Sequence, residues 1–401
     1  MRIGINLTQF VPGKSGGVQT YAETLVRGLV AKDRGHRYVL FVNYLTAPLF
    51  EDLRGSCETV MVDVHIPRWV KLLDRAVHGA VFRAYGRGLK DLLIRADLDL
   101  LHFPLSFIVP FDYPGRTVVT FLDLQHEHLP EFFSAAELTW RERNYRPSAA
   151  RASHLIAISE YTARSLVERY GVPREKITVV HLAAGEDIRS PEGPERHDER
   201  LPQRFFCYPA AYWPHKNHAR LLQALARLRE RDGFDLPLVL TGMEAADAEP
   251  VRREVARLGL TEQVRMLGYV PRAAFRHMLR RAEFMVFPSL FEGFGLPVVE
   301  AMAIGCPVAC SCATSLPEIV GEDGYLFDPE DVEQIARAIR DLWRDPGLRD
   351  RLRVRLRSRA EAFTTARMAD ATAAVYQQVA GSPAPREGAS SPTASPSLVR
   401  G

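Results

Sequence analysis

Short apolar runs alternate with longer amphipathic segments along most of this 401-residue chain. The runs are rich in Val, Ile and Leu and apolar on both faces, as strands are when helices cover both sides of a parallel sheet. Parallel strands need crossover helices, so this order predicts βαβ connections and a doubly wound α/β sheet. In the first half we expect strands at Arg2–Asn6, Tyr38–Val42, Glu58–Val62, Leu100–Phe103, Thr117–Phe121, His154–Ile158 and Ile177–Val180.

A polar stretch with three prolines, 184–203, interrupts this rhythm and predicts an interdomain linker. A second α/β series follows, with strands expected at Arg204–Tyr208, Leu238–Thr241, Val264–Leu267, Phe284–Phe287 and Pro307–Cys310. We therefore predict an N-terminal domain over 1–183, a C-terminal domain over 204–362, a helix over 363–380 that returns to the N-terminal domain, and a disordered tail over 381–401 rich in Gly, Ser, Pro and Ala. Ligands of such sheets bind beyond the carboxyl ends of the strands, so the two domains should face each other across one cleft.

Composition excludes several classes of protein. The 52 Lys and Arg nearly balance the 49 Asp and Glu, which argues against a partner that binds through net charge alone, and no nucleic-acid-binding motif is present. No run of 18 apolar residues and no basic leader followed by an apolar core occurs. The five cysteines are an odd number without paired spacing, so we expect reduced thiols and a cytoplasmic protein.

The strongest functional pattern lies in the segment 284–310, FMVFPSLFEGFGLPVVEAMAIGCPVAC. A strand is expected to end near Phe287, and a glycine-containing loop leads to Pro297, which suits the first turn of a helix. Main-chain amides at such a helix start form an anion site. Glu300, expected in the first turn of the helix, could accept hydrogen bonds from a ribose diol, and Glu292 in the loop could bind another polyol. The alternative is that both glutamates only complement the helix dipole.

Two further loops follow strands. In YPAAYWPHKN, 208–217, Lys216 lies at a helix entrance that Asn217 is expected to cap, which together would clamp a diphosphate. After the first strand, Gly16 and Gly17 of GKSGG open a helix and could present amides to a phosphate from the other side of the cleft.

Together these residues resemble the Glu-x7-Glu glycosyltransferases of family 4, whose fold is GT-B, two Rossmann-like domains facing across a cleft. The match is carried by Pro288-Ser289, by Glu292 to Pro297 and by Glu300-Ala301, with support from SLPE at 315–318 and GYLF at 324–327. The resemblance implies that Glu292 binds the donor sugar, Glu300 the ribose and Lys216 with Asn217 the diphosphate. It also implies that amides of Phe294, Gly295 and Leu296, with Gly16 and Gly17, bind the phosphates, and that Tyr269 and Val270 read the base; plain packing is the alternative for the last two.

Two positions depart from the family pattern. Ala211 stands where many members have an Arg, and Leu122 where many have a His. His215, Asn217 or Trp213 could compensate for the missing cation. Asp123 or His126 in the loop FLDLQHEHLP could replace the His near the reacting sugar, with His126 ranked first; an ordinary surface loop is the alternative.

We expect no metal site and no cofactor, because the Asp97 and Asp99 pair resembles a turn cap before a strand. The stretch 65–95 is basic and amphipathic. This pattern indicates either contact with the inner face of an anionic membrane or a helix face exposed to solvent.

The resemblance implies a metal-independent, retaining hexosyltransferase that uses a UDP- or GDP-linked sugar and a saccharide or lipid-linked acceptor. The alternatives are a nucleotide-sugar epimerase or phosphorylase of the same fold, or a donor-binding relative without activity.

Overall fold

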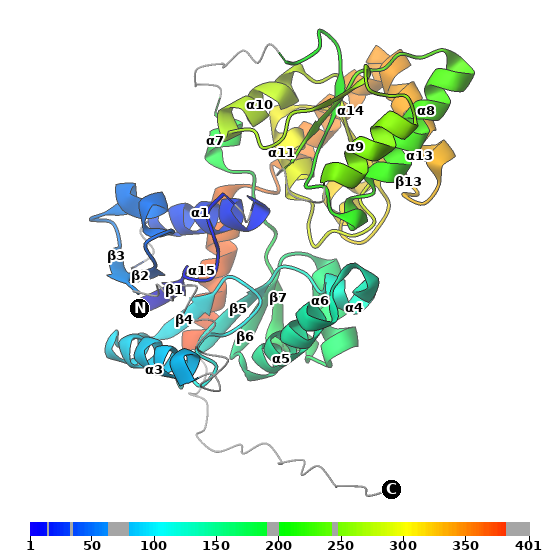
Figure 1. The fold of residues 1–401 in the computed structure, drawn as a ribbon. Coiled ribbons are helices and arrows are strands. Elements are labelled where there is room, and N and C mark those ends of the chain that lie inside the picture. Colours follow the sequence, from blue (N-terminus) through cyan, green and yellow to red (C-terminus); the bar gives the residue numbers. More distant parts are fainter. Residues whose placement is uncertain (14–15, 33–34, 63–79, 191–199, 243–247, 382–401) are drawn as a thin grey trace, which may run out of the picture.

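The computed structural model describes residues 1–13, 16–32, 35–62, 80–190, 200–242 and 248–381 (Figure 1). Residues 382–401 of the predicted tail and residues 65–79 of the predicted membrane-contact stretch lie outside the described residues. Within the described part of the chain, the strands form two wholly parallel sheets, of seven and six strands.

The first sheet has the strand order β3-β2-β1-β4-β5-β6-β7. Its strands are β1 (Arg2–Asn6), β2 (Arg37–Val42), β3 (Glu58–Met61), β4 (Leu100–Phe103), β5 (Thr117–Phe121), β6 (His154–Ala157) and β7 (Ile177–Val179). Its helices are α1 (Gly16–Val30), η1 (Ala47–Leu53), α3 (Ala80–Arg95), α4 (Gln125–His128), η2 (Pro130–Phe132), α5 (Ala135–Arg151), α6 (Glu160–Tyr170) and η3 (Arg174–Lys176).

The second sheet repeats this order as β10-β9-β8-β11-β12-β13. Its strands are β8 (Phe206–Pro209), β9 (Leu238–Thr241), β10 (Val264–Met266), β11 (Met285–Phe287), β12 (Val308–Ser311) and β13 (Tyr325–Phe327). Its helices are η4 (Pro214–Lys216), α8 (His218–Asp232), α9 (Ala248–Arg257), α10 (Arg272–Arg281), α11 (Leu296–Ile304), α12 (Leu316–Val320), η5 (Gly321–Asp323), α13 (Val332–Arg344) and α14 (Pro346–Ala360).

These two sheets confirm the predicted doubly wound α/β class. Each predicted strand is present with ends shifted by at most two residues, and β13 is an additional strand that the apolar pattern did not predict. The central strands β4, β5, β8 and β9 are buried along their whole length, which explains why their sequences are largely apolar. In both sheets the strand order reverses beside the first strand, at β1 with β4 and at β8 with β11, so the loops after these strands open a crevice.

Two segments connect the halves. The segment predicted as a linker contains the short helix α7 (Glu186–Arg189), whose Ile188 is buried, while 191–199 lie outside the described residues. The last helix, α15 (Thr365–Gly381), lies among the elements of the N-terminal half, packed against α1, β4 and β6 (Figure 1). Its Tyr376 hydroxyl is 2.7 Å from Nδ1 of buried His102 in β4, whose Nε2 is 2.8 Å from the Thr120 hydroxyl.

The described part of the basic stretch belongs to α3. Its Leu89 and Leu93 are buried, and Lys90 forms an ion pair of 2.7 Å with Asp112. No helix in the ranges the structure describes is long and apolar enough to cross a membrane. Contact with an anionic membrane therefore stays a prediction.

Candidate functional site

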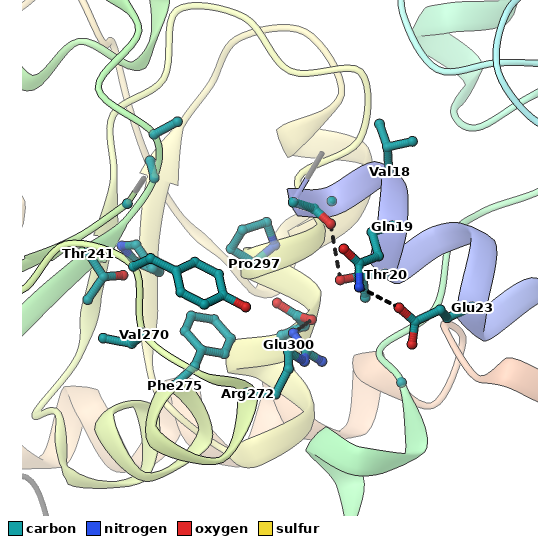
Figure 2. Close-up of a pocket in the computed structure, with 18 of the residues that line it drawn as sticks. Val18, Gln19, Thr20, Glu23, Thr241, Val270, Arg272, Phe275, Pro297 and Glu300 are labelled. Atoms are coloured by element: carbon teal, nitrogen blue, oxygen red, sulfur yellow. Dashed lines mark hydrogen bonds and ion pairs between the residues drawn. The ribbon is translucent and has the colours of Figure 1, made fainter. Parts of the chain in front are cut away.

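A cavity of about 890 Å³ lies between the two halves of the chain. Figure 2 shows Val18, Gln19, Thr20 and Glu23 of α1 on one side, facing Pro297, Glu300, Arg272, Phe275, Val270 and Thr241 of the C-terminal half on the other. Of the candidate residues from the sequence, the structure brings seven together in its lining: Gly16, Gly17, Trp213, Lys216, Tyr269, Val270 and Glu300. Asp123, His126, Asn217, Glu292, Phe294, Gly295 and Leu296 are not part of this lining.

Both ends of α11 have the predicted geometry, with a proline in the first turn and a glycine that ends the helix. Gly295 precedes α11 with φ of 102°, and a Cβ there would lie 2.6 Å from Leu316 Cδ2, so this position requires glycine. Pro297 is in the first turn and Gly305 ends the helix with a left-handed φ of 86°. Glu300 is the fifth residue of α11, just beyond the first turn in which the sequence placed it.

Residues of the β12–α12 connection hold this loop in place. The Ser315 hydroxyl donates to the main-chain carbonyls of Glu292 at 3.0 Å and Phe294 at 2.9 Å. The Glu292 N–H donates to the Thr314 hydroxyl at 3.0 Å. The side chains of Phe294 and Leu296 are buried, so any contact with a phosphate would come from their main-chain amides.

Lys216 and Glu292 form a close ion pair across this loop. Lys216 Nζ lies 2.6 Å from Glu292 Oε1, and the two side chains are only 14% and 11% exposed. The Tyr208 hydroxyl donates to the Lys216 carbonyl at 2.8 Å, which fixes the end of η4. The predicted cation and the predicted sugar-binding carboxylate are therefore neighbours, although 76 residues separate them in the chain.

The predicted capping role of Asn217 is wrong, because its side chain makes no cap hydrogen bond. Asn217 adopts a left-handed conformation with φ of 62°, and Nδ2 donates to the carbonyls of Pro288 at 2.9 Å and Pro329 at 2.7 Å. Neighbouring His215 does not supply the missing cation either. Burial, with a smaller contribution from Lys216, lowers the pKa of His215 to about 3, so the imidazole is neutral near pH 7.

Glu300 belongs to a charged cluster that the sequence did not predict. Its Oε1 accepts from Nη1 of Arg272 at 2.6 Å, and Arg272 also donates from Nε to Asp187 Oδ2 at 2.8 Å. Burial raises the pKa of Glu300, and the adjacent Arg272 guanidinium opposes that rise. Burial disfavours the charged form of Arg272, but Glu300 and Asp187 outweigh it and raise the pKa of Arg272.

On the N-terminal side, Gly16 and Gly17 are the exposed first residues of α1. A Cβ at either position would meet nothing within 4 Å, so the space in front of this helix start is open to a ligand. The preceding turn is tied to α1, because the Gly13 N–H donates to Gln19 Oε1 at 2.9 Å and Gln19 Nε2 donates to Glu23 at 2.7 Å. Residues 14–15 lie outside the described residues.

His126 lies in the interior of the N-terminal half rather than beside the cavity. Its Nε2 is 2.9 Å from the Tyr170 hydroxyl, and the rings of Phe133 and Tyr145 pack around it. Burial, with a smaller contribution from Arg141, lowers the pKa of His126 to about 4. Its assignment near the reacting sugar stays a prediction that this placement does not favour.

Asp123 lies where the two halves touch. Its Oδ1 accepts from the Gln125 N–H at 3.0 Å, and a Cβ on Gly293 would lie 3.0 Å from the Asp123 Cβ and 2.0 Å from the Leu122 carbonyl oxygen. The Gly293 carbonyl in turn accepts from the Ser159 hydroxyl at 2.7 Å. The loop that carries Glu292 is therefore in direct contact with the loop that follows β5.

A second contact between the halves is made by Glu318. Its carboxylate accepts from the Glu160 N–H at 2.9 and 3.0 Å, which caps the start of α6, and lies 2.6 Å from His181 Nε2. Because Glu318 is in the SLPE segment after β12, this part of the pattern joins the halves and does not line the cavity.

Comparisons with known proteins decide the family. A profile described as glycosyl transferases group 1 matches residues 190–361, and one described as glycosyltransferase family 4 matches residues 15–184. The O-antigen chain mannosyltransferase B of Escherichia coli is 31% identical over 271 residues, which cover 66% of this chain and 71% of that protein. The chain therefore belongs to the family 4 glycosyltransferases. A Mycolicibacterium hassiacum MMP alpha-(1->4)-mannosyltransferase is 33% identical over 234 residues, 57% of this chain and 55% of that protein.

Solved structures support the fold of this glycosyltransferase. Sucrose-phosphate synthase from Thermosynechococcus elongatus has a TM-score of 0.74 at 20% identity, over 94% of this chain and 99% of that one. The Anabaena protein HepE in complex with UDP and glucose has a TM-score of 0.69 at 18% identity, over 94% of this chain and 100% of that one. At such identities the likeness concerns the fold alone.

The sequence reading of this glycosyltransferase missed Arg272 and Asp187. The only local signal was that both follow turn-forming segments near predicted strand ends, a property shared by many charged surface residues. Asp99, considered for a metal, instead accepts from the Arg2 N–H at 2.7 Å. Among the residues that the structure describes, no group of three or more His, Cys, Asp and Glu side chains is placed to hold a metal ion.

Proposed function

We propose that this glycosyltransferase moves a hexosyl group from a UDP- or GDP-linked sugar to a saccharide or lipid-linked acceptor, with retention of the anomeric configuration and without a metal ion. The observation that carries the proposal is the placement of Lys216, Glu292 and Glu300 around the start of α11, beside a cavity that the glycines of α1 complete. The relatives named as mannosyltransferases favour a hexose, with mannose foremost.

The site has the charges that cleavage of a glycosyl–phosphate bond requires. Negative charge develops on the departing diphosphate, so a fixed cation and helix amides aimed at it lower the barrier. Lys216 supplies the cation, and the amides of the Gly293–Leu296 loop and of Gly16 and Gly17 supply the dipoles. Because Lys216 and Glu292 pair at 2.6 Å, we propose that the diphosphate replaces Glu292 as the partner of Lys216, while a sugar hydroxyl donates to Glu292.

Glu300 contributes orientation. A carboxylate that accepts from both ribose hydroxyls fixes the nucleotide, and a fixed nucleotide holds the anomeric carbon near the acceptor hydroxyl. In the proposed same-face attack, the departing phosphate oxygen takes the proton of that hydroxyl.

The test is transfer with GDP-mannose and UDP-glucose, each with free mannose and mannosyl oligosaccharide acceptors, in buffer containing EDTA. We expect NDP release that depends on an acceptor, and an α-linked product by NMR. A β-linked product would overturn retention, and loss of activity in EDTA that Mg²⁺ restores would overturn metal independence. Epimerisation of the donor, transfer of its sugar to inorganic phosphate, or donor binding without turnover on any acceptor would overturn the transferase proposal in favour of its alternatives.

A further inference from the structure

Three charged side chains from three separate helices meet beside the cavity. Arg272 is the first residue of α10, Asp187 lies in α7, and Glu300 lies in α11. Arg272 donates from Nη1 to Glu300 at 2.6 Å, and from Nε and Nη2 to the two oxygens of Asp187 at 2.8 and 3.2 Å. Figure 2 shows Arg272 and Glu300 side by side, and both line the cavity.

Because Glu300 is buried, its charge depends on the neighbouring cation. Its side chain is 4% exposed, whereas that of Arg272 is 37% exposed and that of Asp187 is 51% exposed. A carboxylate buried to this extent without a cation would favour its protonated form and lose acceptor capacity. Arg272 therefore decides whether Glu300 can act as a charged acceptor for a polyol.

The same guanidinium is anchored to the segment that connects the halves. Besides the two contacts from Arg272, the Asp187 carbonyl accepts from Arg276 Nη1 at 2.7 Å. A Cβ at Gly185 would lie 2.4 Å from Asp187 Oδ1, so glycine at this position leaves room for the carboxylate to face Arg272. Asp187 of the connecting segment therefore holds Nε and Nη2 of the Arg272 guanidinium, and Nη1 contacts Glu300.

We propose that Arg272 is a positioning residue of the donor site, which keeps Glu300 charged and aimed at the ribose hydroxyls, and that Asp187 of the connecting segment orients Arg272. The inference rests on the proposed function, since it takes Glu300 to be the ribose acceptor. It adds a residue and a connection that the Glu-x7-Glu pattern does not contain.

The electrostatics predict opposite effects at the two partners. The charged groups that face Glu300 are Arg272 from α10 and Asp187 from α7, while Lys216, Glu186, Glu23 and Arg27 line the same cavity. Arg272 lowers the pKa of Glu300 and Asp187 raises it. Arg272→Met should therefore shift the protonation of Glu300 to higher pH, and Asp187→Asn should shift it to lower pH.

The experiment compares two ligands that differ only at the ribose. Calorimetry measures the Kd of UDP and GDP and of their 2′,3′-dideoxy counterparts between pH 5 and 8.5, for the full-length wild type and for Arg272→Met, Arg272→Lys and Asp187→Asn. The ratio of the two Kd values isolates the ribose contact, because both ligands carry the same diphosphate. Arg280→Met is the matched control, since Arg280 lies on the same helix and donates to the Ser190 carbonyl of the same connecting segment at 2.9 Å without a contact to Glu300.

We expect the wild type to prefer the ribose nucleotide by about tenfold or more, as hydrogen bonds to a charged group imply. Arg272→Met should reduce this preference to about unity near neutral pH and recover part of it as the pH rises. Arg272→Lys should recover more, and Asp187→Asn should move the midpoint of the pH dependence downwards. Arg280→Met should keep the wild-type ratio.

The melting temperature of each variant shows that the protein compared is folded. If Arg272→Met weakens both nucleotides equally and leaves their ratio at the wild-type value, Arg272 has a structural role only and the inference is overturned, while the proposed function stands. If Arg272→Met does not fold, Arg272→Lys and Asp187→Asn decide, and a wild-type ratio and pH dependence in both overturns the inference. If the wild type binds neither UDP nor GDP, the proposed function fails and the inference fails with it.

Discussion

Replacement of Gly293 by alanine should push apart the two loops that meet between the halves of the protein. A Cβ on Gly293 would lie 2.0 Å from the Leu122 carbonyl oxygen and 3.0 Å from the Asp123 Cβ. Because real Cβ atoms essentially never approach another heavy atom within 3.0 Å, at least 3.0 − 2.0 = 1.0 Å of movement is needed. The obstacle is main chain at the end of a buried strand, so a side-chain rotation cannot relieve it.

The expected consequence is a loss of turnover that exceeds the loss of donor binding. A misplacement of about 1 Å between reacting groups can cost about 10²-fold in rate. Donor contacts proposed for Lys216, Glu300 and the base-reading residues belong to the C-terminal half, and only those of Gly16 and Gly17 come from the N-terminal half, so the Kd of the donor should change by less than about tenfold. Overpacking at a close contact costs about 1–3 kcal/mol of stability, which should also lower the melting temperature by several degrees.

The assay is steady-state transfer with calorimetric donor binding, for the wild type, Gly293→Ala and the control Gly88→Ala. Gly88 is an exposed residue of α3 where a Cβ would meet nothing within 4 Å. Its replacement should leave kcat unchanged and the melting temperature unchanged or slightly raised, because alanine is favoured over glycine inside a helix. Wild-type kcat and melting temperature in Gly293→Ala would show that this approach of the two loops is unimportant in solution.

Three further predictions concern charge. Lys216→Ala should lower kcat by about 10²–10³-fold and the affinity for the donor by much less, whereas Lys32→Ala at an exposed surface ion pair should change neither; intact turnover in Lys216→Ala would remove the clamp assignment. Burial raises the pKa of Glu318, but its contacts with His181 and the N–H groups of Glu160 and Tyr161 outweigh it and leave the pKa lowered. This carboxylate therefore stabilises the fold above its unfolded pKa of about 4.3, and the difference in melting temperature between wild type and Glu318→Gln should be present at pH 7 and shrink as the pH falls from that value through the lowered folded-state pKa; a difference that grows as the pH falls below 4.3 would contradict the reasoning. Burial lowers the pKa of four histidines, to about 3 for His102, His215 and His218 and to about 4 for His126. Their unfolded forms bind protons below about pH 6.5 and the folded forms do not, so stability should fall from pH 6.5 towards pH 4 by up to about 1.4 kcal/mol per pH unit for each histidine; a flat denaturation midpoint over this range would contradict it.

The strands and the start of α11 were predictable because their causes are local. A buried parallel strand needs a largely apolar run, and each of the runs predicted from the sequence became a strand or its core. The start of α11 was equally local, since Gly295, Pro297 and Gly305 have backbone requirements that few other residues meet. β13 was missed because its sequence, Tyr325–Phe327, is short and has an exposed Leu326, so it lacks the apolar signature of the central strands.

The orientation of His126 was not predictable in this way. The segment 121–130 is polar enough for a surface loop, and nothing in its own sequence indicates that the ring turns inward. The direction is decided by Tyr170, which lies 44 residues further on, and by Tyr145, which packs perpendicular to the imidazole. Polar residues after a strand can therefore be placed near a cleft from sequence, while the side of the backbone they occupy depends on distant packing.

The same distinction explains why the glutamates of the site were found and the residue that controls one of them was not. Glu292 and Glu300 are recognisable because the loop and helix between them impose a fixed spacing. Arg272 lies 28 residues from Glu300 and 85 residues from Asp187, so no spacing records their contact. Yet a carboxylate with 4% exposure cannot remain a charged acceptor through its position in a motif alone. A sequence pattern that places a buried glutamate in a ligand site therefore implies a cation nearby, and the search for it belongs on the helices that pack against that glutamate, here α10 and α7.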